Sequence, residues 1–319
     1  MKKLQISISP HINSSLTTQK IMLDVVIALI PALVASVVFF GWRALLVTSF
    51  CIVVCVLAQY LFEVLCKRPV EAGDLSAVVT GMLLAFNLPV TIPLWQAAIG
   101  SIFAIIVVKE LFGGIGHNFA NPAITARVVM LLAFSSSMTN WVVPGSAELV
   151  TGATPLALIA QDKMGELPSL LDMFLGKIGG SLGETSALAL IIGGVYLVIR
   201  RVIRWHTPVF FVGTVFVGAL LFSGFDVSFA LYQILSGGLM LGAIFMATDY
   251  STTPPTPFGK VVFGIGCGLI TLVIRLWGSY PEGVSYAILL MNILAPYISD
   301  LTRHKIFGAV KAKKGGKAA

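Results

Sequence analysis

Long apolar runs separated by short polar segments dominate the chain. The first, from Ile21 to Phe40, predicts a transmembrane helix, because about 20 apolar residues cross a bilayer and the core of a signal peptide is shorter. Nine further runs predict nine more helices: Ala44–Leu65, Leu75–Leu88, Leu94–Leu111, Ala120–Met138, Ser186–Ile203, Val209–Phe222, Ala230–Ala247, Val261–Trp277 and Val284–Ile298. The pattern therefore predicts an all-α polytopic membrane protein of about ten transmembrane helices.

Polar residues interrupt or enter three of these runs. Asn87 and Pro89 end the third run early, and Asp249 follows the eighth; broken segments of this kind commonly line a site buried within a helix bundle. Asp249 could serve such a site or simply face water. Arg127 lies inside the fifth run, where a guanidinium should pair with a carboxylate, a phosphate or a carbonyl. Few acidic residues fall within the runs, so the sequence offers little for a proton relay.

The chain also contains a weak internal repeat. Proline, glycine and apolar residues recur at an offset of 164 positions, in the pairs Pro93 and Pro257, Gly100 and Gly264, Ile106 and Ile270, Gly114 and Gly278, Ala123 and Ala287, and Ile124 and Ile288. If the repeat is not a coincidence, each half holds five spans. Because five is odd, the two halves would have opposite orientations in the membrane.

Composition narrows the class of protein. Hydrophobic residues make up 57% of the chain and charged residues 11%, against about 45–50% and about 25% in soluble proteins. This excludes a soluble enzyme, a disordered protein and a secreted disulfide scaffold. The four cysteines lie in apolar runs without a CxxC pair, so we expect no zinc site and no structural disulfide.

The net charge of +7 comes largely from one side of the expected membrane. With the N-terminus inside, sixteen Lys and Arg residues fall on the cytoplasmic side and four on the other, which is a strong positive-inside bias. Both termini are therefore expected in the cytoplasm, and no nucleic-acid partner is expected. The expected organisation is a cytoplasmic segment 1–20, a first five-helix repeat 21–138, an external loop 139–185, a second repeat 186–300 and a basic cytoplasmic tail 301–319.

Two polar motifs are candidates for chemistry. Thr151-Gly152-Ala153-Thr154-Pro155 lies in the external loop, where small neighbours leave a threonine hydroxyl open to a modifying enzyme. Its alternative, which spacing alone favours, is a helix N-cap at Thr154 with Pro155 at the first helical position. In residues 113–123, Asn118 and Asn121 are three positions apart, so both amides could project from one face of a turn into a helix. The alternative is a turn capped by Asn121.

Five motifs in order give the chain a resemblance to a known family. They are residues 113–123, 151–155, 245–249, 263–268 and 280–287. Through them, over about residues 20 to 300, the chain resembles the D subunit of the Rnf complex, a membrane-bound ferredoxin:NAD oxidoreductase. It is more distantly similar to the B subunit of the sodium-pumping NADH:quinone oxidoreductase. The resemblance implies a urea-transporter-like fold of two inverted five-helix repeats.

The resemblance also implies cofactors. In that family the last Thr of the Thr-Gly-Ala-Thr signature carries FMN through a phosphoester bond, which implies covalent FMN at Thr154, with Thr151, Gly152 and Ala153 beside it. Riboflavin, bound non-covalently, would lie near Asn118, Asn121 and Asp249. Arg127, for its depth in the membrane, is a further candidate cofactor-binding residue, and no metal site is expected.

The function implied is electron relay between ferredoxin and NAD, coupled to Na⁺ or H⁺ translocation across a prokaryotic inner membrane, with the flavin loop on the outer face. The chain would be one subunit of the enzyme, its partners being other membrane and flavin or iron–sulfur subunits and a flavin transferase. One alternative is a small-solute channel of the urea-transporter type without redox activity. Another is a structural membrane anchor.

Overall fold

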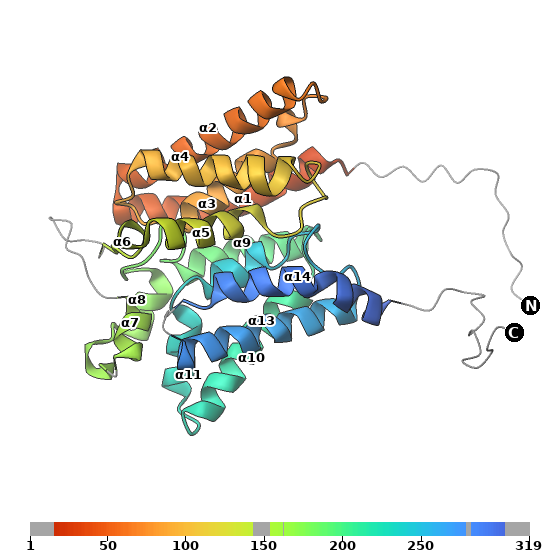
Figure 1. The fold of residues 1–319 in the computed structure, drawn as a ribbon. Coiled ribbons are helices and arrows are strands. Elements are labelled where there is room, and N and C mark those ends of the chain that lie inside the picture. The colour runs from red at the N-terminus through yellow and green to blue at the C-terminus, as the bar shows by residue number, and fades with distance from the viewer. Residues whose placement is uncertain (1–15, 143–153, 162, 279–281, 304–319) are drawn as a thin grey trace, which may run out of the picture.

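The computed structural model describes residues 16–142, 154–161, 163–278 and 282–303, and helices account for the regular secondary structure within these ranges (Figure 1). The α-helices are α1 (Thr18–Phe40), α2 (Trp42–Leu65), α3 (Ser76–Phe86), α4 (Leu94–Ile102), α5 (Pro122–Ala133), α6 (Ser135–Met138), α7 (Pro155–Ala160), α8 (Leu170–Leu175), α9 (Ala187–Ile199), α10 (His206–Phe222), α11 (Val227–Leu235), α12 (Leu239–Leu241), α13 (Pro257–Trp277) and α14 (Val284–Thr302). Short 3₁₀ turns are η1 (Ala72–Asp74) and η3 (Met164–Glu166), and π-helical segments are η2 (Phe103–Glu110) and η4 (Gly242–Met246).

Four of the described helices, α1, α2, α13 and α14, are long and apolar enough to cross a membrane. A bent pair, α11 with α12 and η4, would make a fifth span. The outer faces of these helices are apolar as well, since Val38 is 73% exposed and Leu57 is 52% exposed. Apolar side chains on the outside suit a lipid solvent, so the chain is a multi-pass membrane protein.

The expected runs coincide with helices or helix pairs, with two corrections. The eighth, Ala230–Ala247, is not one helix: α11 and α12 meet at an angle of 67° across residues 236–238. The fifth, Ala120–Met138, is divided by Phe134 into α5 and α6. Gly237 lies in the break between α11 and α12. Its φ of +57° is a backbone conformation that favours glycine.

The end of the expected external loop is buried inside the bundle. Residues 178–187 are all buried, and the backbone of this segment pairs with the end of α3. The Leu182 amide donates to the Leu88 carbonyl at 3.0 Å, and the Gly183 amide donates to the Phe86 carbonyl at 2.9 Å. Non-helical backbone at membrane depth is tolerated where protein covers it, and this segment meets that condition.

Helices far apart in the sequence pack in pairs. α1 packs against α9, α5 against α14, α2 against α4, and α10 against α13. The start of α1 and the end of α14 lie at one end of the bundle, whereas α6, α7 and α8 gather at the other (Figure 1). The candidate residues of the sequence divide between these two ends.

Candidate functional site

The first cavity brings together the asparagine motif and Asp249. It lies beside the starts of α1 and α5 and is lined, among others, by Asn118, Asn121, Asp249, Ser76 and Lys109. We call it the asparagine pocket. The tertiary structure therefore joins Asn121 and Asp249, which are 128 positions apart in the sequence.

The two asparagines have different roles in this pocket. Asn121 is the N-cap of α5: its Oδ1 accepts from the amides of Ala123 and Ile124 at 3.0 and 3.3 Å, which confirms the cap interpretation. Its Nδ2 donates to the Met246 carbonyl at 3.3 Å. Among the described residues, the buried Oδ1 of Asn118 has no hydrogen-bond partner. A buried acceptor of this kind is the group that a ligand donor would satisfy.

Asp249 lines the same pocket and lies just after η4. Its Oδ2 accepts from the hydroxyls of Ser251 and Thr252, both at 3.2 Å. Burial raises the pKa of the Asp249 carboxyl, against the lowering effect of these hydrogen bonds. Asp249 therefore contributes a polar wall to the pocket, while Phe245 and Val79 contribute apolar surface.

A second, smaller cavity contains Thr154. It has a volume of only about 10 Å³ and is lined by Thr154, Pro155, Leu156, Ile178, Gly179, Gly180, Glu184, Thr185, Gly237 and Glu282. We call it the threonine pocket. Thr154 is the N-cap of α7, with its Oγ1 accepting from the Ala157 amide at 3.2 Å and Pro155 at the first helical position, which confirms the cap interpretation. Thr151, Gly152 and Ala153 lie outside the described residues.

Arg127 connects the threonine pocket to the core of the bundle. Its guanidinium pairs with Glu184 at 3.2 Å and with Glu282, and both carboxylates line that pocket. It also donates to Asn87 Oδ1 at 2.7 Å. Arg127 therefore has the carboxylate partners that its depth in the sequence predicted. Its role in cofactor binding stays a prediction.

A Cβ on Gly238 would lie 2.5 Å from the Glu184 carboxylate and 3.3 Å from Arg127. Glycine at this position of the α11–α12 break therefore leaves room for the ion pair of Arg127 and Glu184.

The sequence-based interpretation did not find several buried polar residues. Glu184 and Glu282 were assigned no role, and Lys109 and Arg275 were counted as charges at the membrane surface, although they are 2% and 9% exposed. Arg275 donates to the carbonyls of Gln233 and Ser236 at the end of α11. Each of these residues stands at the end of an apolar run, where a sequence cannot distinguish a buried side chain from a surface one.

These observations define a class: a multi-pass membrane protein whose helix bundle holds one polar pocket near the start of α1 and another near the start of α14. Residues 5–308 match the family described as the NQR2, RnfD, RnfE family. The chain belongs to that family.

Relatives match over almost the whole chain. It is 47% identical over 317 residues to the D subunit of the Na⁺-translocating ferredoxin:NAD⁺ oxidoreductase complex of Acetobacterium woodii, covering 99% of this chain and 98% of the relative. It is 39% identical over 316 residues to the D subunit of the proton-translocating ferredoxin:NAD⁺ oxidoreductase complex of Clostridium ljungdahlii, covering 95% and 96%. It is 38% identical to the D subunit of the ion-translocating oxidoreductase complex of Stutzerimonas stutzeri, covering 92% of each chain.

Proposed function

We propose that this chain is the electron-relaying membrane subunit of an ion-translocating ferredoxin:NAD oxidoreductase complex. It carries FMN covalently on Thr154 and binds a second flavin, riboflavin, in the asparagine pocket, and electron transfer is coupled to movement of Na⁺ or H⁺. One observation carries the proposal. The residues that the family resemblance implies for flavin binding lie in two separate pockets, toward opposite ends of one helix bundle. The names of the full-length relatives support ferredoxin and NAD as the terminal carriers.

Thr154 supplies the hydroxyl to which the proposal attaches FMN, at the wall of the threonine pocket. Thr154 Oγ1 acts as an acceptor in the α7 cap, so an ester at this oxygen need not remove the cap. Glu184 and Glu282 would repel a phosphate, and the single Arg127 guanidinium that pairs with both of them offsets only part of this repulsion.

The asparagine pocket suits an uncharged, planar ligand with polar edges. Asn118 presents an unsatisfied acceptor, and Asp249 and Asn121 add polar groups to a wall that is otherwise largely apolar. A flavin supplies electron transfer when bound, while the protein sets its position and its surroundings. The residues present therefore fit riboflavin.

We also propose ten membrane segments in two inverted repeats of the urea-transporter type. α2 begins at Trp42 and α10 at His206, 164 residues later, as the sequence offset requires. The packing pairs support the same symmetry: α2 with α4 corresponds to α10 with α13, and the pairs α1 with α9 and α5 with α14 join corresponding helices of the two halves. The halves are residues 21–138 and 186–300, joined by the loop 139–185.

The proposed location is a prokaryotic inner membrane, with both termini in the cytoplasm and the Thr154 loop on the outer face. This follows from the excess of Lys and Arg on one side of the spans. The proposed partners are the other membrane and flavin or iron–sulfur subunits of the complex, and a flavin transferase that attaches FMN.

The test is covalent flavin fluorescence of the chain on a denaturing gel after expression with a flavin transferase. Wild type, Thr154→Ala and Thr154→Ser are compared with Thr256→Ala. Thr256 is a matched control because it caps α13 in the same way, accepting from the Gly259 amide at 3.0 Å with Pro257 at the first helical position. We expect fluorescence in wild type and in Thr256→Ala, and none in Thr154→Ala.

Both alanine variants lose a cap worth about 1 kcal/mol, so the comparison separates loss of flavin from loss of stability. Thr154→Ser retains the hydroxyl and should retain some flavin. A dark wild-type band, with the transferase active on another substrate, would contradict the proposal and favour a small-solute channel.

A further inference from the structure

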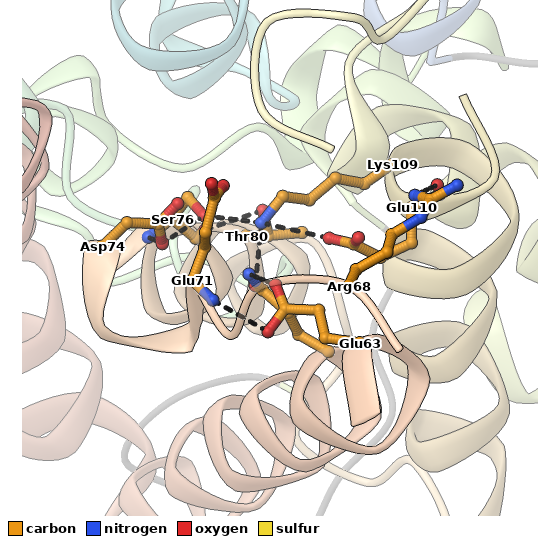
Figure 2. A network of polar contacts seen from close by, with 9 residues as sticks. Glu63, Arg68, Glu71, Asp74, Ser76, Thr80, Lys109 and Glu110 are labelled. Atoms are coloured by element: carbon orange, nitrogen blue, oxygen red, sulfur yellow. Dashed lines mark hydrogen bonds and ion pairs between the residues drawn. The ribbon is translucent and has the colours of Figure 1, made fainter. Parts of the chain in front are cut away.

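A chain of hydrogen bonds links Lys109, Ser76 and Asp74 (Figure 2). Lys109, in η2, donates from Nζ to the Ser76 hydroxyl at 2.5 Å, and the Ser76 hydroxyl donates to Asp74 Oδ1 at 2.6 Å. Lys109 and Ser76 both line the pocket, and Asp74 is partly exposed. A titratable group that water reaches is therefore connected through one hydroxyl to a buried amine at a cavity wall.

Lys109 stands in a polar cluster formed by three segments. Its Nζ also donates to Gln59 Oε1 at 2.8 Å, and the Glu110 carboxylate lies 3.8 Å away. The charged groups around the amine are Glu63 of α2, Arg68 after α2, Asp74 of η1 and Glu110 of η2, with the Cys55 thiol of α2 nearby. Glu63, Arg68 and Glu110 also line a third cavity, which shares Ile115 with the asparagine pocket.

The three residue types suit proton transfer in this order. A carboxyl group exchanges protons with water, a hydroxyl accepts one hydrogen bond while donating another, and a buried lysine loses its proton readily. An ion pair that served stability alone would not need the hydroxyl between the charges or a face on a cavity. Ionisable residues inside a membrane protein are by default functional.

We propose that Asp74, Ser76 and Lys109 form a proton route between water and the asparagine pocket. Asp74 takes a proton from water. The Ser76 hydroxyl gives its proton to the neutral Lys109 amine and receives the proton of Asp74. The Lys109 ammonium then gives a proton to a water molecule in the pocket, and Asp74 is again a carboxylate, with no electron transferred in these steps. The route does not depend on which molecule occupies the pocket.

The test uses variants that keep the contacts and remove the titration. Lys109→Arg keeps the charge and the donors but holds its proton. Asp74→Asn keeps an oxygen acceptor for Ser76. Asp226→Asn is the matched control, because Asp226 Oδ1 accepts from the Ser228 amide at 2.8 Å as Asp74 Oδ1 accepts from the Ser76 amide at 2.8 Å, and it caps α11 away from both pockets.

The measurement is proton uptake from the outer solution by the complex reconstituted into sealed vesicles, with reduced ferredoxin, NAD⁺ and a pH-sensitive dye outside, in excess of the one proton consumed for each NADH formed. We expect Lys109→Arg and Asp74→Asn to slow this excess uptake at least tenfold, and Asp226→Asn to leave it unchanged. Non-covalent flavin content is measured in the same samples. Variants with normal flavin content and slow uptake would support the route. A wild-type complex without non-covalent flavin would contradict the proposed function but not the proton route.

Wild-type uptake in an assembled Lys109→Arg or Asp74→Asn complex would overturn the inference, as would a wild-type complex with no excess uptake. If neither variant assembles, Ser76→Ala and Ser76→Thr decide the matter. The threonine retains a hydroxyl and should retain the rate, whereas the alanine should lose at least tenfold. Equal rates in the two would overturn the route.

Discussion

Arg127 of α5 donates a hydrogen bond of 2.7 Å to the side-chain oxygen of Asn87, the residue at which α3 ends. The same guanidinium holds Glu184 and Glu282. A single buried cation thus links a helix terminus, the buried loop segment and the start of α14. The rigidity of the threonine pocket depends on this junction, because Glu184 and Glu282 form part of its wall.

Replacing Arg127 by leucine should lower the free energy of unfolding by about 3–5 kcal/mol, since two buried carboxylates lose their partner. Equilibrium unfolding in mixed detergent micelles measures this loss. Arg204→Leu, at an exposed arginine, should change stability by less than about 1 kcal/mol. Equal effects of the two substitutions would show that the Arg127 cluster contributes nothing particular to stability.

Gly183→Ala should disturb the buried loop segment. A Cβ at Gly183 would overlap the Phe86 Cβ, whereas a Cβ at Gly165 would meet nothing within 4 Å. Overpacking of this kind costs about 1–3 kcal/mol, so we expect Gly183→Ala to lower the midpoint of thermal unfolding and Gly165→Ala to leave it unchanged. A Gly183→Ala protein as stable as wild type would mean that the segment does not pack against α3 as the structure has it.

Arg275→Lys should lower the stability of the protein at the bend between α11 and α12. The guanidinium donates to the carbonyls of both Gln233 and Ser236, and one ammonium cannot match that fork. We expect a loss of about 1–3 kcal/mol, from a buried acceptor left without its donor. Arg43→Lys is the control, because Arg43 donates to the carbonyls of Val90 and Thr91 where solvent competes. Its unfolding midpoint should stay near that of wild type.

Asn118→Ala should weaken non-covalent flavin binding in the asparagine pocket. Loss of one hydrogen bond is worth about 0.5–1.5 kcal/mol, which corresponds to about a threefold to tenfold higher dissociation constant. The purified protein is titrated with riboflavin, and the non-covalently bound flavin is then extracted with acid and quantified. His117→Ala, one residue away and exposed, should bind as wild type does. Unchanged binding by Asn118→Ala would remove Asn118 from the proposed site.

The sequence alone determined the class of this protein and the positions of its helices. Apolar runs are long-range features that a bilayer demands of any spanning helix, so α1, α2, α13 and α14 begin and end close to the expected residues. The caps at Thr154 and Asn121 were also predictable, because a cap is a local hydrogen bond between a side chain and the next turn. The motifs gave the family, which the comparison with relatives confirmed.

Only the tertiary structure decided which of these residues meet. The break at Gly237, the burial of residues 178–187 and the partners of Arg127 depend on contacts between different helices and loops, such as Arg127 with Asn87 and Arg275 with Ser236. Lys109 shows the same limit: in sequence it is a charge near the end of an apolar run, and in the fold it is a buried amine hydrogen-bonded to Ser76. Hydrophobic patterning reports the solvent that a segment faces on average, whereas a polar site is made by the few side chains that packing brings together.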